Sequence, residues 1–170
     1  MNGLRLLRVS EINWRDRKYK RAGIIPMVEQ GNVQFFGFGV ENGVAAIGDF
    51  GGKIERRDRD ALDAAIREYY EESFGVFGDI TRDTLQNCFV LDGTDTAEIL
   101  LPVSGPLYQY TERFHQIGIS PEHEVQSIIW LSRRQLLTAI DSPEVSFEGT
   151  KIYHMYDRIR NTIQLNRDMI

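Results

Sequence analysis

A short acidic cluster between positions 67 and 72 has residue types and spacing that suit metal chemistry. The segment reads Arg67-Glu68-Tyr69-Tyr70-Glu71-Glu72. On a helix, residues three and four apart share a face, so Glu68 would lie beside both Glu71 and Glu72. Like charges at this spacing weaken a helix by roughly 0.2–0.5 kcal/mol per pair. Because a hard divalent cation such as Mg²⁺ prefers oxygen ligands and offsets that repulsion, we predict a metal site here.

The surroundings of the cluster favour a functional role over a solvated acidic face, which is the usual fate of such residues. Arg67 can reach Glu71 one turn later and orient its carboxylate. The glycines Gly51 and Gly52 precede the helix by a short loop, where bare backbone can approach an ion or a phosphate closely. The opposite helix face would dock onto a core, because it is apolar. Its residues are Leu62, Ala65, Ile66, Tyr69 and Tyr70.

The segment from Gly51 to Val76 resembles the signature of the Nudix hydrolases, G-x5-E-x7-R-E-U-x-E-E-x-G-U, where U is a bulky apolar residue. Residues 67–72 match the R-E-U-x-E-E core position for position, and Gly51-Gly52-Lys53 resembles the glycine pair that opens the loop in many members. Both flanks are one residue longer than the pattern. Gly75 would therefore cap the helix one residue late. The upstream acid of the signature is left open, and the candidates are Glu55, Asp58 and Asp60.

The resemblance implies a divalent-metal-dependent hydrolase that cleaves a pyrophosphate bond in a nucleoside diphosphate linked to another group. The cofactor would be Mg²⁺ or Mn²⁺. The implied metal ligands are Glu68, Glu71 and Glu72, with Glu72 the strongest candidate, and a backbone carbonyl of Gly51 or Gly52. Such cations neutralise phosphate oxygens, position a water molecule and lower its pKa.

The residues implied for the other catalytic roles come from three segments. Glu68, Glu71 and Arg67 belong to the signature, and Arg67 would mainly orient the acidic cluster. Lys53 and Gly52 would contact the substrate phosphates. The general base is expected from Pro121-Glu122-His123-Glu124, where Glu124 is preferred over Glu122. His123 could act as a base at neutral pH, although a lone loop histidine is more often solvated.

The elements that must position these residues follow from hydrophobic patterns. We predict strands over Ala22–Glu29, Val33–Val40, Val44–Phe50, Leu85–Leu91, Ala97–Val103 and Val125–Leu131. We predict helices over Asp60–Phe74, Arg133–Ile140 and Lys151–Asn166, and a helix or lid-like loop over Tyr108–Ile117. Pro26, late in the first strand, would suit an edge or a bulge. The order predicts α/β (α+β) layering, and the resemblance implies a Nudix-type α/β/α sandwich with a mixed β-sheet.

Composition agrees with one enzyme-sized domain over residues 1–170. The single cysteine, Cys88, excludes an internal disulfide and suits a reducing compartment, so we expect a cytoplasmic protein. No stretch is long or apolar enough to span a membrane, and the N-terminus lacks the apolar core of a signal peptide. The sequence leaves the oligomeric state open and is compatible with a homodimer.

Charge and aromatic residues leave the substrate open. Residues 1–21 form a basic arm of net charge +5 on a chain whose net charge is −5, and Trp14 and Tyr19 within it could stack a base. This arm mildly favours capped RNA, the substrate of mRNA-decapping members, whereas the acidic remainder favours a free nucleotide, which we prefer. Base-stacking candidates elsewhere are Phe35, Phe36, Phe38, Tyr108, Tyr110 and Phe114.

A non-catalytic nucleotide-binding or interaction module with the Nudix fold is the alternative from another functional class. The intact R-E-x-x-E-E core at residues 67–72 argues against it. A module relieved of metal chemistry would have no reason to keep carboxylates that repel one another.

Overall fold

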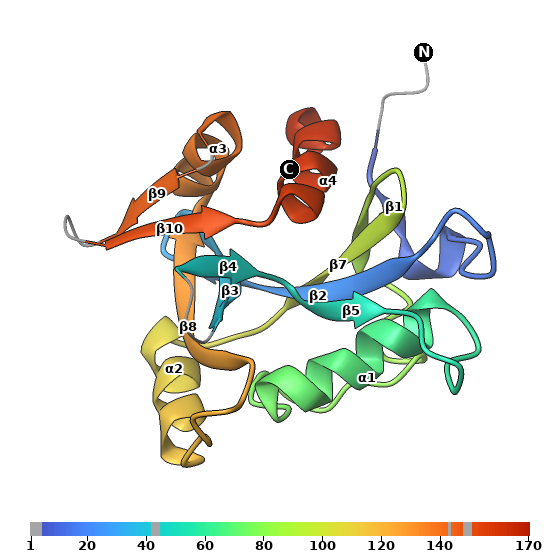
Figure 1. Ribbon diagram of the computed structural model, residues 1–170. Helices are drawn as coiled ribbons and strands as arrows, with labels where there is room; N and C mark the ends of the chain where they lie inside the picture. The colour runs from blue at the N-terminus through green and yellow to red at the C-terminus, as the bar shows by residue number, and fades with distance from the viewer. Residues whose placement is uncertain (1–4, 42–44, 143, 148–150) are drawn as a thin grey trace.

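One mixed β-sheet forms the centre of the molecule (Figure 1). The computed structural model describes residues 5–41, 45–142, 144–147 and 151–170, without the side chains of 144–147 and 151–153. The strands within these residues are β1 (Leu7–Arg8), β2 (Arg21–Gln30), β3 (Val33–Glu41), β4 (Ala46–Gly48), β5 (Phe50–Lys53), β6 (Phe89–Asp92), β7 (Thr96–Pro102), β8 (Val125–Ser132), β9 (Glu144–Phe147) and β10 (Lys151–Met155). They run in the order β1-β6-β7-β2-β3-β4-β10-β9, while β5 also pairs with β2 and β8 with β3. The β2–β7 and β4–β10 pairs are parallel, and the other described pairs are antiparallel.

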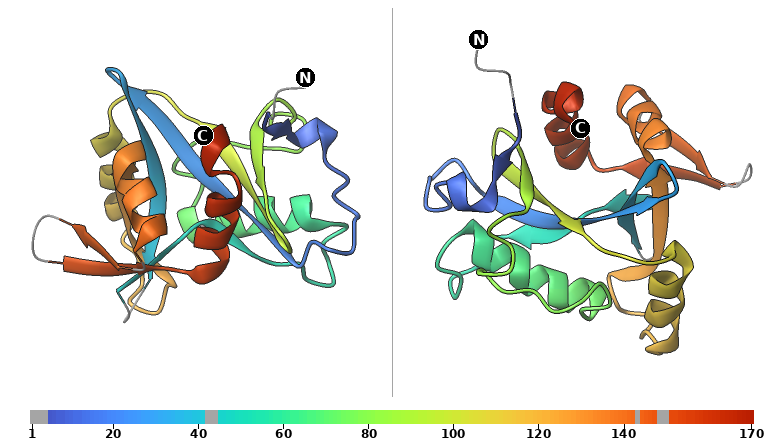
Figure 2. Two further views of the ribbon diagram at one scale, coloured as in Figure 1. Left: turned by 90° about the horizontal axis from the view of Figure 1, so that it is seen from above. Right: turned by 180° about the vertical axis from the view of Figure 1, so that it is seen from behind.

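Helices cover both faces of this sheet (Figure 2). They are α1 (Ala61–Ser73), α2 (Leu107–Gln116), α3 (Arg133–Asp141) and α4 (Asp157–Leu165), and two short 3₁₀ helices cover Val9–Glu11 and Arg167–Met169. The core on one face contains residues of α1 and α2, and the core on the other face contains residues of α3 and α4. Neighbouring residues of β2 alternate between them, since Ile24 packs into the first core and Ile25 into the second. The predicted α/β class and its three-layer arrangement are confirmed.

Strand β2 is central although it contains Pro26. Its Arg21–Ile24 half pairs with β5 and its Met27–Gln30 half with β3, so Pro26 falls between the two antiparallel partners. On the other side of β2, Pro26 lies opposite Leu101 of the parallel strand β7. Because proline has no N–H to donate, the change of partner is where a central strand can accept it.

Helix α1 has the boundaries expected from its capping residues. The Asp60 carboxylate accepts a hydrogen bond from the Asp63 backbone N–H at 3.1 Å, which makes Asp60 the N-cap. At the other end Phe74 (φ 57°) and Gly75 (φ 71°) are both left-handed. Two left-handed residues in succession account for the longer flank after the acidic cluster.

Two predictions are wrong in part: the helix predicted over Lys151–Asn166 and the strand predicted over Leu85–Leu91. Lys151–Met155 is strand β10, paired with β4 and β9, and only the following residues form helix α4. A short apolar run fits either periodicity, and here the long-range strand pairing prevails. In the range Leu85–Leu91, only its last part belongs to β6, because a turn with a Cys88 N–H to Leu85 carbonyl hydrogen bond of 2.9 Å precedes it.

The strand predicted over Val44–Phe50 is divided at Asp49. β4 ends at Gly48 and β5 begins at Phe50, and Val44 lies outside the described residues. β4 pairs with β3, whereas β5 pairs with β2. The break therefore places Asp49 where the chain passes from one partner strand to another.

The described part of the predicted basic arm, residues 5–21, packs against the sheet through its buried side chains. Trp14 and Tyr19 are 7% and 5% exposed and belong to the core, so neither is available to stack a base. Tyr19 donates a hydrogen bond to Asp92 at 2.7 Å, and Arg21 is buried. Among the described helices, none combines the length and apolar character needed to cross a membrane.

Candidate functional site

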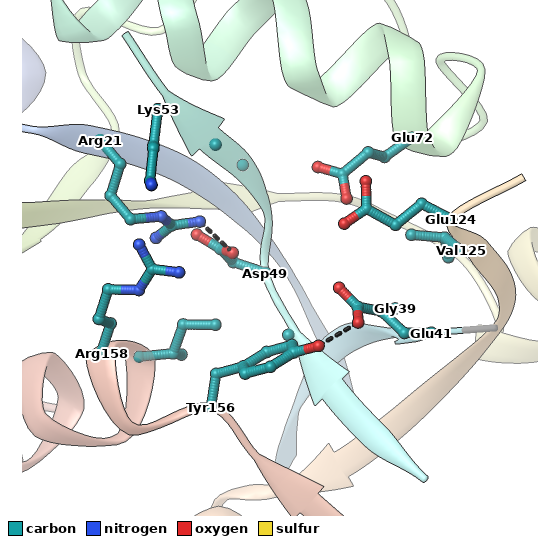
Figure 3. Close-up of a pocket in the computed structure, with 14 residues that line it drawn as sticks. Arg21, Gly39, Glu41, Asp49, Lys53, Glu72, Glu124, Val125, Tyr156 and Arg158 are labelled. Atoms are coloured by element: carbon teal, nitrogen blue, oxygen red, sulfur yellow. Dashed lines mark hydrogen bonds and ion pairs between the residues drawn. The ribbon is translucent and has the colours of Figure 1, made fainter. Parts of the chain in front are cut away.

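A pocket opens where the break at Asp49, the end of α1, the start of β8 and the start of α4 meet (Figure 3). Its volume is about 210 Å³. Glu41, Glu72 and Glu124 line one side, and Arg21, Lys53 and Arg158 lie on the other side together with Asp49, as Figure 3 shows. The lining residues are Arg21, Gly39, Glu41, Gly48, Asp49, Gly51, Gly52, Lys53, Glu72, Glu124, Val125, Tyr156, Arg158 and Ile159.

Glu72 is the acidic-cluster residue that lines this pocket. Its side chain is buried, with the residue 6% exposed, and its Oε1 has no hydrogen-bond partner among the described residues. Burial, together with the nearby carboxylates of Asp49, Glu124 and Glu68, raises the pKa of the Glu72 carboxyl to about 10. A buried acid with an unpaired oxygen that faces other acids is costly unless a proton or a cation accompanies it.

Asp49 is a pocket residue that the sequence analysis did not identify. Its Oδ1 forms a salt bridge with the Arg21 guanidinium at an N–O distance of 2.6 Å, while its Oδ2 has no partner among the described residues. Although burial acts to raise the pKa of Asp49, the Arg21 guanidinium holds it below its usual value. The only local signal was a lone acid in an otherwise apolar stretch, which does not reveal a pocket by itself.

Behind Asp49, Glu98 completes a buried triad. Arg21 also contacts Glu98 at 3.1 Å, and burial together with the Asp49 charge raises the pKa of Glu98 well above its usual range. Gly23 permits this arrangement, because a Cβ there would lie 1.9 Å from Asp49 Oδ2 and 3.0 Å from Glu98 Oε2. One guanidinium thus faces two carboxylates, of which Glu98 has the raised pKa and Asp49 the lowered one.

Glu124, the predicted base, also lines the pocket. Burial raises its pKa, and so do a hydrogen bond with Glu41 and the charge of that residue. Tyr156, immediately before α4, donates a hydrogen bond to the Glu41 carboxylate. The other base candidates do not line the pocket. Glu122 accepts a hydrogen bond from the Ser120 hydroxyl, and the His123 ring contacts the Glu72 carbonyl oxygen at 3.0 Å.

Glu68 is not one of the residues that line the pocket, but it lies against Gly52, which is. A Cβ on Gly52 would be 2.3 Å from Glu68 Oε1, so this carboxylate rests directly on the Gly52 backbone. Burial raises the pKa of Glu68, which the hydrogen bond from Arg67 partly opposes. The glycine therefore serves close approach of a side chain, as expected for a residue without a Cβ.

Glu71 does not line the pocket either. Its side chain is 47% exposed, and it forms salt bridges to Arg57 at 2.9 Å and to Arg67 at 3.2 Å. The three cluster carboxylates therefore do not open into a single cleft. The catalytic and metal-binding roles of Glu71 remain predictions.

Arg67 connects the glycine loop to the helix. Its guanidinium pairs with both oxygens of Asp58, at 2.9 and 3.1 Å, and donates to the Lys53 carbonyl at 3.2 Å. It also contacts Glu68 at 3.0 Å. Among the three upstream acids, Asp58 is the buried partner of Arg67, Asp60 caps the helix, and Glu55 is exposed. This agrees with an orienting role for Arg67.

The donor set of the pocket suits a hard divalent cation. Two buried carboxylate oxygens, Glu72 Oε1 and Asp49 Oδ2, lack a partner among the described residues, and Glu124 lies beside Glu72 (Figure 3). Oxygen donors of this kind are those that Mg²⁺ and Mn²⁺ prefer. Within the described part of the chain, however, no three His, Cys, Asp or Glu side chains already form a metal-binding group. The metal site therefore remains a prediction.

The aromatic residues proposed for base stacking do not line the pocket. Phe36, Phe38, Tyr110 and Phe114 are buried in the two cores, whereas Tyr108 is 69% exposed on α2. The pocket thus has charged side chains and glycine backbone but no stacking ring from this set.

Comparison with known proteins gives structural neighbours only. No family model matches this chain, and no curated protein sequence matches it. Among solved structures, a Nudix hydrolase from M. smegmatis, RenU, is 10% identical with a TM-score of 0.48, over 89% of this chain and 85% of that one. A second neighbour is the crystal structure of a C. elegans Ap4A hydrolase in a binary complex. Its sequence is 18% identical to this chain, and the TM-score is 0.44 over 72% of this chain and 84% of that one. These values establish no family, so the function must be inferred from the site itself.

Proposed function

We propose that this protein is a divalent-metal-dependent hydrolase that cleaves a phosphoric anhydride bond in a nucleoside diphosphate linked to another group. The observation that carries the proposal is the buried Glu72 carboxylate, whose Oε1 has no partner among the described residues, in a pocket whose opposite side holds three cationic side chains. A substrate with adjacent phosphates would provide counter-charges for both sides of the pocket. Its phosphate oxygens would pair with the cationic side chains, and the metal ion that accompanies it would pair with the carboxylates. The match of residues 67–72 to the Nudix core supports the same chemistry.

Glu72 and Asp49 would hold Mg²⁺ or Mn²⁺ through the oxygens that lack a partner among the described residues. Glu68 rests on the backbone of Gly52, which lines the same pocket. The cation, when bound, would neutralise phosphate charge and lower the pKa of the attacking water. Arg21 keeps Asp49 ionised through the 2.6 Å salt bridge. Arg67 would hold Glu68 and the glycine loop in register.

The hydrolysis itself requires a proton acceptor, and Glu124 is our candidate. The water oxygen would bond to one phosphorus atom while the bridging P–O bond breaks, and the second phosphate would leave with the bridging oxygen. Glu124 would accept the proton that the water loses. Burial and the neighbouring Glu41 raise the pKa of Glu124, which makes its carboxylate a better proton acceptor than an exposed glutamate.

A product-release screen tests the proposal. Nucleoside triphosphates, nucleotide sugars, dinucleoside polyphosphates and capped RNA would be incubated with the protein and Mg²⁺ or Mn²⁺, and products separated by chromatography. We expect metal-dependent cleavage of at least one nucleoside-diphosphate compound, lost with a chelator and reduced at least about 100-fold in Glu72→Gln. Binding of these compounds without cleavage of any of them would instead favour the non-catalytic module.

A further inference from the structure

The cationic side of the pocket contains a residue contributed by the last helix. Arg158 lies in the first turn of α4 and lines the pocket together with Lys53 of β5 and Arg21 of β2. In Figure 3 the side chains of these three residues gather opposite Glu72 and Glu124. Three chain segments that are distant in the sequence thus bring positive charge to one place.

The fold holds Arg158 in this position from both sides. Strand β10 runs parallel to β4, with Met155 opposite Ile47, so the chain leaves the sheet beside the Asp49 break. Ile159 is 2% exposed and anchors the start of α4 in the core. Tyr156 donates a hydrogen bond to Glu41 on the opposite side of the pocket. Arg158 therefore projects from an anchored segment.

The three cations differ in whether they are already paired. Arg21 is buried and engaged by Asp49 and Glu98 at 2.6 and 3.1 Å. Arg158 and Lys53 are exposed, and neither side chain forms a hydrogen bond or salt bridge that the described residues account for. Two cations without partners beside a group of carboxylates are suited to an anion that enters from solvent.

Resting on the proposed function, we infer that Arg158, with Lys53, binds the substrate phosphate that lies away from Glu72 and Glu124. The pocket volume of about 210 Å³ is below the range of about 300–1,000 Å³ usual for complete small-molecule sites, so phosphates would fill it and the nucleoside would lie outside. The carboxylate side with its cation would take one phosphate and the Arg158 side the next. The pocket would therefore select a diphosphate over a single phosphate.

Binding of methylenediphosphonate, whose P–C–P bridge cannot be hydrolysed, tests this inference. Its affinity and that of inorganic phosphate would be measured by isothermal titration with the full chain in Mg²⁺. We expect wild type to prefer the diphosphonate, and Arg158→Ala to lose roughly tenfold in diphosphonate affinity, about one charge-assisted hydrogen bond, with a smaller change for phosphate. Arg158→Lys should recover part of the loss.

Arg160→Ala is the matched control, because it removes the same charge from the same helix outside the pocket. Arg160 pairs with the exposed Asp157 at 3.2 Å, so its loss should leave both affinities unchanged. Equal diphosphonate affinity of wild type and Arg158→Ala, an equal loss in Arg160→Ala, or no diphosphonate binding by wild type would overturn the inference. Failure of the proposed function is a separate result, since wild type could show the diphosphonate preference while hydrolysing no substrate.

Discussion

At the residue scale, Glu72 is the side chain that most needs a companion charge. It is 6% exposed, its Oε1 has no hydrogen-bond partner in the part of the chain that the structure describes, and burial is the main cause that raises its pKa to about 10. An acid kept protonated in this way is a common feature of sites that bind cations or transfer protons. The same burial means that Glu72 lowers the free energy of unfolding of the metal-free protein at neutral pH.

Glu72→Gln should therefore stabilise the metal-free protein, and the effect should depend on pH. Below about pH 4.5 the folded and unfolded states both keep the proton, so wild type and variant should be equally stable. Between pH 4.5 and about 10 only the unfolded state loses it, so the wild type loses stability as the pH rises. Urea unfolding with EDTA at pH 7.5 should give Glu72→Gln an advantage of about 2–4 kcal/mol.

Glu71→Gln provides the comparison for this measurement. The Glu71 side chain is 47% exposed and already paired with two arginines, so its replacement should change the free energy of unfolding by less than about 0.5 kcal/mol. If Glu72→Gln were no more stable than Glu71→Gln at pH 7.5, the Glu72 carboxyl would not be buried as described.

At the scale of elements, the loop between β5 and α1 depends on Arg67. The Asp58 side chain is 4% exposed and Arg67 is its bidentate partner. Arg67→Ala would leave that carboxylate buried without a counterion, which should cost about 2–4 kcal/mol in urea unfolding at pH 7. Arg57→Ala is the control, because Arg57 is 63% exposed and should contribute less than about 0.5 kcal/mol. Equal losses in the two variants would contradict this account.

The two glycines of β5 should respond differently to alanine. A Cβ on Gly51 would meet backbone atoms, at 2.4 Å from Gly23 Cα and 2.6 Å from the Ala22 carbonyl oxygen, so β5 would have to separate from β2. A Cβ on Gly52 would instead meet the flexible end of Glu68. Thermal unfolding should show a loss of about 2–4 kcal/mol for Gly51→Ala and a smaller loss for Gly52→Ala. Hydrolysis by the folded Gly52→Ala variant should nevertheless fall, and unchanged turnover would exclude a role for the Glu68 position.

At the scale of the whole molecule, local patterns predicted elements better than they predicted the site. Helix α1 and strand β8 have strong periodicity and caps, and their predicted ranges differ from the observed ones by one residue at each end or less. The alternating pattern of strands and helices also predicted the α/β class. The stretch Lys151–Met155 was assigned to a helix because its pairing with β4, about 100 residues earlier, leaves no local trace.

The same limit explains which site residues were missed. Glu72 was found because it lies in a recognisable motif, and Glu124 because the family resemblance places a general base in the loop before β8. Asp49 and Arg158 reach the pocket only through the β4–β5 break and the β10–β4 pairing, so no spacing in the sequence relates them. Likewise, Trp14 looked like a stacking residue because composition does not reveal that its ring is buried. Sites assembled by long-range strand pairing require the fold before they can be recognised.

Direct titration with Mn²⁺ tests the central claim, that the pocket around Glu72 binds a divalent cation. Free Mn²⁺ would be followed by electron paramagnetic resonance in solutions of wild type, Glu72→Gln and Glu71→Gln. We expect wild type to bind Mn²⁺, Glu72→Gln to lose at least about tenfold in affinity, and Glu71→Gln, whose side chain lies outside the pocket, to stay within about threefold of wild type. Equal Mn²⁺ affinity of wild type and Glu72→Gln would contradict the claim.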